Sequence, residues 1–539
     1  MPPRVLLGDE AVALAALHAG ITAAYAYPGT PSTEILEFIL RQPTNGPGQP
    51  RAAWCANEKT AYEQALGVSL AGRRSIVAMK HVGLNVAADP FVNSALVAIN
   101  GGLVVAVADD PGMHSSQNEQ DSRVLADFAR IICLEPRNQQ EAYDMTREAF
   151  DLSERFDIPV MLRLVTRLAH SRAVVNIGDA VPQRPLSKAP HEADWILLPS
   201  NARRRWRDLL ARQAAFLDYT ETSRYNTLAL ASREVGVITT GIARNYFAEN
   251  LPDMLDAPSH LHIGAYPIPV ALVRRLAASV KRVVVLEDGY PYVERALKGL
   301  LPSSITVEGR ESAALPPDGE LTPDTVRKAI GLSPHHASIG SGFRVPERPP
   351  QLCSGCPHLD SFHALQEALK DRSQSFVASD IGCYTLAALP PLQAIESCVC
   401  MGASVGMAKG ASDAGLRPAV AVIGDSTFLH SGVTPLMDAI ASNTDMTLIV
   451  VDNEVVGMTG AQPTLLNSSR LEPLIRGLGV DPDHLHVLDA HPRHTQANAE
   501  IIRKELDYAG LSVIVAVRVC VEAARARKTA ARANEGVPA

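Results

Sequence analysis

Ala419-Val-Ala-Val-Ile-Gly-Asp-Ser-Thr427 and Thr447-Leu-Ile-Val-Val-Asp-Asn453 are the two stretches of sequence that decide the fold. Each begins with an apolar run of strand length and ends in polar residues. The helix-compatible stretch 432–442 lies between them, and a crossover of this length makes the two strands parallel, with their carboxyl ends at one edge of the sheet. Open α/β sheets bind their ligands at that edge.

Asp425 and Asn453 end these strands and are the candidate ligands of a magnesium ion. Mg²⁺ prefers one or two protein oxygen ligands together with phosphate oxygens, and Gly424 would let the backbone approach a diphosphate. The spacing of 28 residues resembles the thiamine-diphosphate motif, although Ser426 replaces its last glycine and Asp452 its first asparagine. The alternative is a surface turn in which Asp425 caps a helix.

Strands and helices alternate in the same way elsewhere in the chain, which predicts an α/β protein with three parallel-sheet domains. Seven prolines between residues 315 and 350 predict a linker before the third domain. The expected segments are a first domain (1–175), a connection (176–230), a middle domain (231–310), a Pro-rich linker (311–350), a third domain (351–520) and a flexible tail (521–539).

Composition excludes several classes of protein. Hydrophobic residues make up 46% of the chain and charged residues 20%, as in globular proteins. The net charge of −8 is spread along the chain, so we expect no nucleic-acid surface. Neither a signal-peptide pattern nor an apolar run of membrane-spanning length is present, so a cytoplasmic protein without membrane contact is expected.

Five of the eight cysteines fall between Cys353 and Cys400, which in a reducing compartment points to metal or redox chemistry. Four thiols can be grouped as one ligand set with a tight CxxC pair, and they could hold Zn²⁺ or a [4Fe–4S] cluster. Spacing alone leaves both open. The set is Cys353, Cys356, Cys383 and Cys520, and the remaining cysteines (Cys55, Cys133, Cys398 and Cys400) are expected to be buried small hydrophobes.

Several long strings in the chain resemble the 2-oxoacid:ferredoxin oxidoreductases, in particular the alpha subunits of the indolepyruvate type, over residues 1 to about 520. The strings occur in family order and are Tyr27–Ser32, Met79–Asn85, Asp109–Arg123, Cys353–His358, Asp380–Thr385, Cys398–Ala403 and Met458–Gln462. The resemblance implies a pyrimidine-binding domain, a transketolase C-terminal-like domain and a diphosphate-binding domain, in that order.

The resemblance also implies roles for individual residues. Glu58 is the carboxylate that activates the thiamine ring, although alone it would be a helix N-terminal acid. Thr30 contacts the 2-oxoacid, and the magnesium ligands are Asp425, Asn453 and the carbonyl of Val455. Lys80, His81 and His114 are either partners of the substrate carboxylate or of protons, or structural hydrogen-bonding groups. The other expected cofactor contacts are Gly29, Gly382, Gly424, Ser426, Thr427 and Thr459.

The activity implied is oxidative decarboxylation of an aryl 2-oxoacid, such as indolepyruvate or phenylpyruvate, with coenzyme A, using thiamine diphosphate and Mg²⁺. In this family the four-thiol set binds one [4Fe–4S] cluster, and a smaller beta subunit joins a homodimeric core (α2β2-like). Many relatives continue into a ferredoxin-like domain after the fourth cysteine. Because no such cysteines follow Cys520, we expect a partner to take the electrons. The alternatives are a non-oxidative thiamine-dependent decarboxylase or carboligase, and a non-catalytic scaffold subunit.

Overall fold

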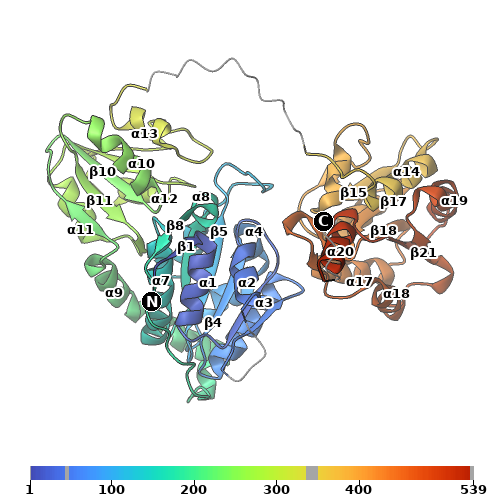
Figure 1. Cartoon of the computed structure of the whole chain (residues 1–539), viewed down its shortest axis with the longest axis horizontal. Coiled ribbons are helices and arrows are strands. Elements are labelled where there is room, and N and C mark those ends of the chain that lie inside the picture. The colour runs from blue at the N-terminus through green and yellow to red at the C-terminus, as the bar shows by residue number, and fades with distance from the viewer. Residues whose placement is uncertain (1, 43–47, 335–349, 535–539) are drawn as a thin grey trace. The chain divides into compact units, whose positions relative to one another are not determined.

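The computed structural model describes residues 2–42, 48–334 and 350–534, which belong to two compact units that divide after residue 341. The first unit contains two sheet domains and the second contains one (Figure 1). The expected α/β architecture with several parallel sheets is confirmed.

The first domain is built on a seven-stranded sheet of order β12-β6-β7-β5-β4-β2-β3, in which only β12 runs antiparallel to its neighbour. Its central strands are uniformly apolar because helices cover both faces of a parallel sheet, and every residue of β4 and β5 is buried. The strands are β2 (Ala23–Ala26), β3 (Arg51–Trp54), β4 (Ser75–Lys80), β5 (Leu103–Asp109), β6 (Cys133–Leu134), β7 (Val160–Val165) and β12 (Ala265–Tyr266), while β1 (Arg4–Leu7) pairs with β8 (Arg172–Val175).

Helices connect these strands in sequence order (Figure 1). Asn57 and Asn138 cap α3 and α7 through side chains that accept backbone N–H groups, which explains where both helices begin. The helices are α1 (Gly8–His18), α2 (Thr33–Leu40), α3 (Glu58–Leu70), α4 (His81–Val86), α5 (Ala88–Ser94), α6 (Ser122–Phe128), α7 (Gln139–Phe156) and α8 (Thr166–His170).

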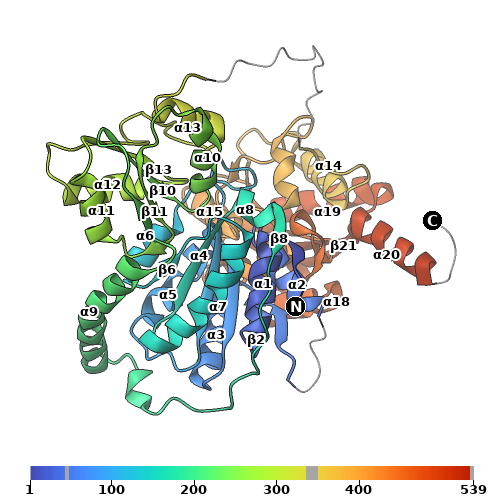
Figure 2. The ribbon, with the colours of Figure 1, turned by 60° about the vertical axis from the view of Figure 1, so that its left-hand side comes forward.

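The middle domain follows helix α9 (Pro199–Thr222) and the 3₁₀ turn η1 (Glu192–Asp194) that precedes it (Figure 2). Its five-stranded sheet has the order β14-β13-β10-β11-β9, with β9 antiparallel. The elements are β9 (Thr227–Ala229), β10 (Val235–Thr240), α10 (Ala243–Asn250), η2 (Leu251–Asp253), β11 (Ser259–Ile263), α11 (Val270–Ala277), β13 (Arg282–Leu286), α12 (Tyr292–Leu300), β14 (Thr306–Glu308) and α13 (Pro323–Ala329). Strand β12, which lies between β11 and α11 in the sequence, pairs with β6 at the edge of the first sheet instead.

The second unit contains a six-stranded, fully parallel sheet of order β16-β15-β17-β18-β22-β21. The strands are β15 (Phe376–Ser379), β16 (Ser397–Cys398), β17 (Ala419–Gly424), β18 (Met446–Asp452), β21 (Leu485–Asp489) and β22 (Leu511–Val517). A hairpin of β19 (Val455–Val456) and β20 (Gln462–Pro463) follows β18, with the 3₁₀ turn η5 (Gly457–Thr459) at its tip. The helices and remaining turns are α14 (Pro357–Leu369), η3 (Cys383–Ala388), α15 (Ala403–Asp413), α16 (Asp425–Thr427), the π-turn η4 (Phe428–Gly432), α17 (Val433–Ala441), α18 (Ser468–Gly477), η6 (Pro482–His484), η7 (Pro492–His494), α19 (Thr495–Leu506) and α20 (Val521–Asn534).

Two segments differ from the expected domain plan. Residues 311–334 are part of the first unit, because Leu321 and Val326 are buried in its core and Pro323 is the first residue of helix α13 rather than a linker proline. Residues 521–534 form helix α20 where we expected a flexible tail, in keeping with the high helix propensity of alanine and arginine. The rest of the expected linker and tail lies outside the described residues.

Candidate functional site

The two carboxylates at the ends of β17 and β18 lie together. The backbone N–H of Glu454 donates to Oδ2 of Asp425 over 3.1 Å and to Oδ1 of Asp452 over 3.2 Å. Both side chains are buried, which excludes the surface-turn alternative for Asp425. Burial, and next the carboxylate of Asp452, raise the pKa of Asp425 well above its usual range.

This pair has the character of a cation site. Among the described residues, no Lys, Arg or His side chain forms an ion pair with either carboxylate, and the buried Oδ2 of Asp452 meets no hydrogen-bond donor. A buried carboxylate without a donor or a cation is costly. Asp425, Asn453 and the carbonyl of buried Val455 offer the oxygen ligands that Mg²⁺ prefers, so the residues present fit that ion.

Asn453 is held on three sides. Its Oδ1 accepts the backbone N–H of Val455 over 3.1 Å, and its Nδ2 lies 3.3 Å from Nε2 of His358. Its backbone carbonyl accepts the N–H of Cys520 over 3.1 Å. The predicted metal turn is therefore attached to two segments that carry predicted thiol ligands.

The aromatic ring of Tyr384 explains the two glycines expected to face the diphosphate. A Cβ added to Gly424 would lie 2.6 Å from Cε1 of Tyr384, and one added to Gly382 would lie 2.2 Å from the same atom. The ring is buried, its hydroxyl donates to Asp380, and it meets the ring of His358 edge-on at 5.9 Å. Packing within the chain already requires glycine at both positions.

The remaining expected cofactor contacts surround this turn. Thr427 donates its hydroxyl to the carbonyl of Ile381 over 3.2 Å, and Thr459 donates to Oε1 of Gln462 over 2.7 Å. Ser426 stands beside Asp425 in the short helix α16. The hydroxyls of Thr427 and Thr459 therefore stabilise the turn.

Three of the four predicted thiol ligands are close enough to the fourth, Cys383, to affect its pKa. The pKa of the Cys383 thiol is raised to about 12, first by burial and then by the neighbouring sulfurs of Cys356, Cys520 and Cys353. A Cβ on Gly457 would lie 3.0 Å from Sγ of Cys383, so this sulfur borders the hairpin that follows Asn453.

The other cysteines correct one expectation. Cys55 and Cys133 are buried, as expected for small hydrophobes, but Cys398 is half-buried and Cys400 is exposed. The reason is position, because Cys398 ends the short edge strand β16 and Cys400 lies in the loop before α15.

In the first unit, Glu58 is the first residue of helix α3 and is buried. Its side chain packs against Gly83 of α4, where an added Cβ would lie 2.5 Å from Oε1 of Glu58. The side chain thus follows β3 at the carboxyl edge of the first sheet and is fixed by a neighbour that has to be glycine.

Lys80, Thr30 and His81 are all contacted by one loop, residues 110–121, which connects β5 to α6. Nζ of Lys80 donates to the carbonyl of Ser115 over 2.8 Å, and the Ser115 hydroxyl donates to the carbonyl of Thr30 over 3.4 Å. Nε2 of His81 lies 3.3 Å from the carbonyl of Asn118. Burial lowers the pKa of Lys80, partly opposed by the carboxylate of Asp110, and Gly29 packs on the side chain of Lys80.

His114 lies on the other side of the same loop. It is half exposed, and its Nε2 is 3.6 Å from Oε2 of Glu320 in the segment after β14. The structure therefore groups Thr30, Lys80 and His81, and it places His114 against the middle domain instead.

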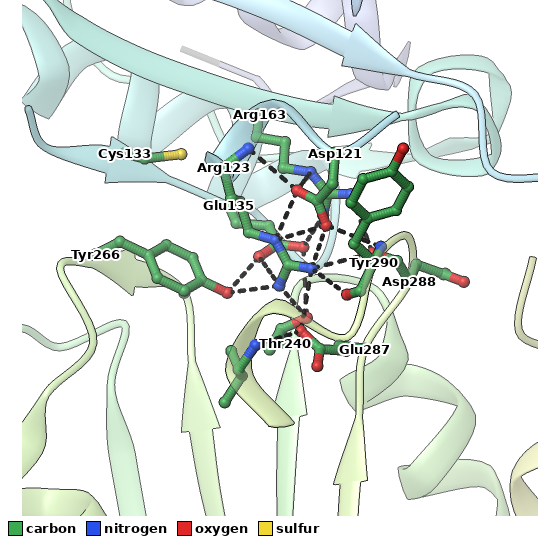
Figure 3. A network of polar contacts seen from close by, with 12 residues as sticks. Asp121, Arg123, Cys133, Glu135, Arg163, Thr240, Tyr266, Glu287, Asp288 and Tyr290 are labelled. Atoms are coloured by element: carbon green, nitrogen blue, oxygen red, sulfur yellow. Dashed lines mark hydrogen bonds and ion pairs between the residues drawn. The ribbon is translucent and has the colours of Figure 1, made fainter. Parts of the chain in front are cut away.

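The loop ends in a buried ionic network that the sequence did not suggest (Figure 3). Arg163 donates through Nε to Asp109 over 2.6 Å and reaches Glu135, while Nη2 of Arg123 lies 3.1 Å from Glu287 of the middle domain. Burial raises the pKa of Glu287 to about 7. These residues lie far apart in the sequence, between Asp109 and Tyr290, so no local pattern could group them. The network fixes Asp121, at the end of the loop, against Tyr290, whose backbone N–H donates to its Oδ2 over 3.1 Å.

Comparison with known proteins assigns both units to one family. Residues 14–204 match the family "Pyruvate flavodoxin/ferredoxin oxidoreductase, thiamine diP-bdg", and residues 380–515 match "Thiamine pyrophosphate enzyme, C-terminal TPP binding domain". The indolepyruvate oxidoreductase subunit IorA of Archaeoglobus fulgidus is 36% identical over 96% of this chain and 86% of its own length. That of Pyrococcus abyssi is 35% identical over 96% of this chain and 85% of its own. The chain belongs to the IorA family.

Membership makes this IorA-family chain an oxidoreductase of the 2-oxoacid class, with thiamine diphosphate as its cofactor. A 2-oxoglutarate:ferredoxin oxidoreductase from Magnetococcus marinus is a more remote likeness, 17% identical over 61% of this chain and 64% of that one, with a TM-score of 0.48. No helix in the described part of the chain is both long and apolar enough to span a bilayer.

Proposed function

We propose that the protein oxidatively decarboxylates an aryl 2-oxoacid of the indolepyruvate or phenylpyruvate type with coenzyme A, using thiamine diphosphate, Mg²⁺ and one [4Fe–4S] cluster. The 2-oxoacid anion and coenzyme A give the aryl-acetyl thioester, carbon dioxide, one proton and two electrons. The aryl preference rests on the relatives, which are named indolepyruvate oxidoreductases.

One observation favours the oxidative assignment over the non-oxidative alternative: the predicted metal turn is in contact with segments that carry the thiol set. The N–H of Cys520 donates to the carbonyl of Asn453, and Sγ of Cys383 borders Gly457 just beyond that residue. When bound, thiamine diphosphate would stabilise the negative charge left by decarboxylation, and an adjacent cluster would accept electrons singly. A decarboxylase without an acceptor has no use for thiols at this position.

The residues of the first unit would bind the organic reactants. Glu58 would hold the proton exchanged with the thiamine ring, and its burial excludes water from that exchange. Lys80 is linked to Thr30 through Ser115 and would attract the substrate carboxylate. His81 is buried and its Nδ1 has no hydrogen-bond partner among the described residues, so it can serve as a further donor or acceptor.

We also propose the assembly. The chain would form a homodimeric core (α2β2-like) that also binds a smaller beta subunit. The printed name of the relatives, "subunit IorA", supports a partner chain.

Iron and acid-labile sulfide in anaerobically purified protein test the proposal. We expect about four of each per chain, a loss of both in Cys356→Ser, and no change in the matched control Cys400→Ser, whose thiol is exposed. A panel of 2-oxoacids should reduce a one-electron dye only when coenzyme A is present. Release of aldehyde without dye reduction, or wild-type protein without iron, would refute the oxidative function.

A further inference from the structure

The histidine that follows the CxxC pair touches the predicted magnesium ligand. His358 is in the first turn of α14, two residues after Cys356, and its side chain is buried. Its Nε2 lies 3.3 Å from Nδ2 of Asn453. The expected mechanism does not use this residue, and its other ring nitrogen, Nδ1, is buried without a hydrogen-bond partner among the described residues.

The chemistry of the contact fixes the direction of the hydrogen bond. An amide nitrogen only donates, so Nε2 of His358 has to accept and the ring proton has to be on Nδ1. The edge-on ring of Tyr384 holds the imidazole in place from the side.

The oxygen and the nitrogen of an asparagine amide are similar in shape and size, but only the oxygen can bind magnesium. With Nδ2 committed to His358, Oδ1 points to the turn of Val455, whose carbonyl is the third predicted ligand. A flipped amide would bring Nδ2 against the backbone N–H of Val455 and, while the ring proton stays on Nδ1, would leave Nε2 of His358 facing an oxygen.

We propose that His358 is a positioning residue that selects the oxygen-forward orientation of Asn453 and so links the thiol-bearing segment at Cys356 to the affinity of the magnesium site. This rests on the proposed function, because it takes Asn453 as a magnesium ligand. Hydrogen-bonding partners of metal ligands typically change metal affinity by 10- to 100-fold when removed.

The test measures binding rather than turnover. Mg²⁺ is titrated calorimetrically into metal-free enzyme with thiamine diphosphate in excess, and iron is measured on the same samples. His358→Leu should weaken Mg²⁺ binding by about 10- to 100-fold with iron content unchanged. His358→Gln places an amide oxygen near the position of Nε2, so it should restore Mg²⁺ binding close to that of the wild type.

A second background makes the test specific for orientation. A carboxylate presents oxygen on both sides, so in the Asn453→Asp background His358→Leu should no longer weaken Mg²⁺ binding. Wild-type affinity in His358→Leu, an equal loss in both backgrounds, or failure of His358→Gln to rescue would overturn the positioning role. Wild-type protein that takes up neither Mg²⁺ nor thiamine diphosphate would instead refute the proposed function itself.

Discussion

Gly424→Ala separates two reasons for the glycine that precedes Asp425, the proposed metal ligand. If the glycine is needed because a ligand approaches the backbone, alanine should impair binding and leave the fold intact. The structure gives a different reason, since the new Cβ would lie 2.6 Å from Cε1 and 3.3 Å from Cδ1 of Tyr384. That ring is buried and its hydroxyl bonds Asp380, so it cannot move aside freely.

The expected cost follows from this overlap. Overpacking a rigid core usually costs about 1–3 kcal/mol. For a unit of this size, that corresponds to a fall of roughly 2–12 °C in its unfolding midpoint. Gly406→Ala is the matched control, because Gly406 is exposed within helix α15 and nothing lies within 4 Å of its added Cβ. That change should stabilise the same unit by about 0.5–1 kcal/mol.

The assay can be confined to one unit, because all three tryptophans, Trp54, Trp195 and Trp206, belong to the first unit. Tryptophan fluorescence therefore follows the unfolding of the first unit, while far-ultraviolet circular dichroism follows both. In Gly424→Ala the dichroism transition that has no counterpart in fluorescence should shift to lower temperature. An unshifted midpoint combined with lost thiamine diphosphate binding would refute the packing explanation.

Three further outcomes are expected from the first unit. Glu58→Gln should lower turnover by several orders of magnitude while thiamine diphosphate still binds, as measured by calorimetry, and near-normal turnover would contradict a role for its proton. Burial lowers the pKa of His260 and His262 to about 3, below the unfolded value of 6.5. Their contribution to stability is therefore full above pH 6.5 and declines as the pH falls toward 3, by up to about 1.4 kcal/mol per pH unit for each histidine. His262→Gln should flatten this decline in urea unfolding followed by fluorescence. Arg163→Met should cost about 3–5 kcal/mol in the same assay because it leaves buried carboxylates uncompensated, whereas loss of the exposed Arg41–Glu37 pair should cost no more than about 0.5 kcal/mol.

The parallel sheets could be predicted because their strands are almost uninterrupted apolar runs. The expected strand Ala419–Ile423 appears as β17 (Ala419–Gly424), and the expected Leu103–Ala108 as β5 (Leu103–Asp109). Prediction failed where tertiary contacts decide the state of a segment. Pro323 looked like part of a linker, but burial of Leu321 and Val326 draws that segment into the core of the first unit.

The candidate site divides in the same way. Asp425, Asn453 and the thiols could be singled out as candidates from the sequence because each belongs to a short string with its own chemical character. Arg123 and Glu287, in contrast, are 164 residues apart and become partners only through the packing of two domains. Sequence spacing carries no information on such a pair.

A residue that matches a motif can have a cause other than the motif's ligand. Gly424 and Gly382 both lie beneath one tyrosine ring, and that ring also supports His358, which contacts Asn453. The glycines would therefore act on the proposed metal site through side-chain packing: they leave room for Tyr384, Tyr384 contacts the imidazole of His358, and the imidazole would orient the amide of Asn453. Because each step is a contact between buried groups, a substitution at either glycine should reach the metal ligand even though neither glycine would touch the ion.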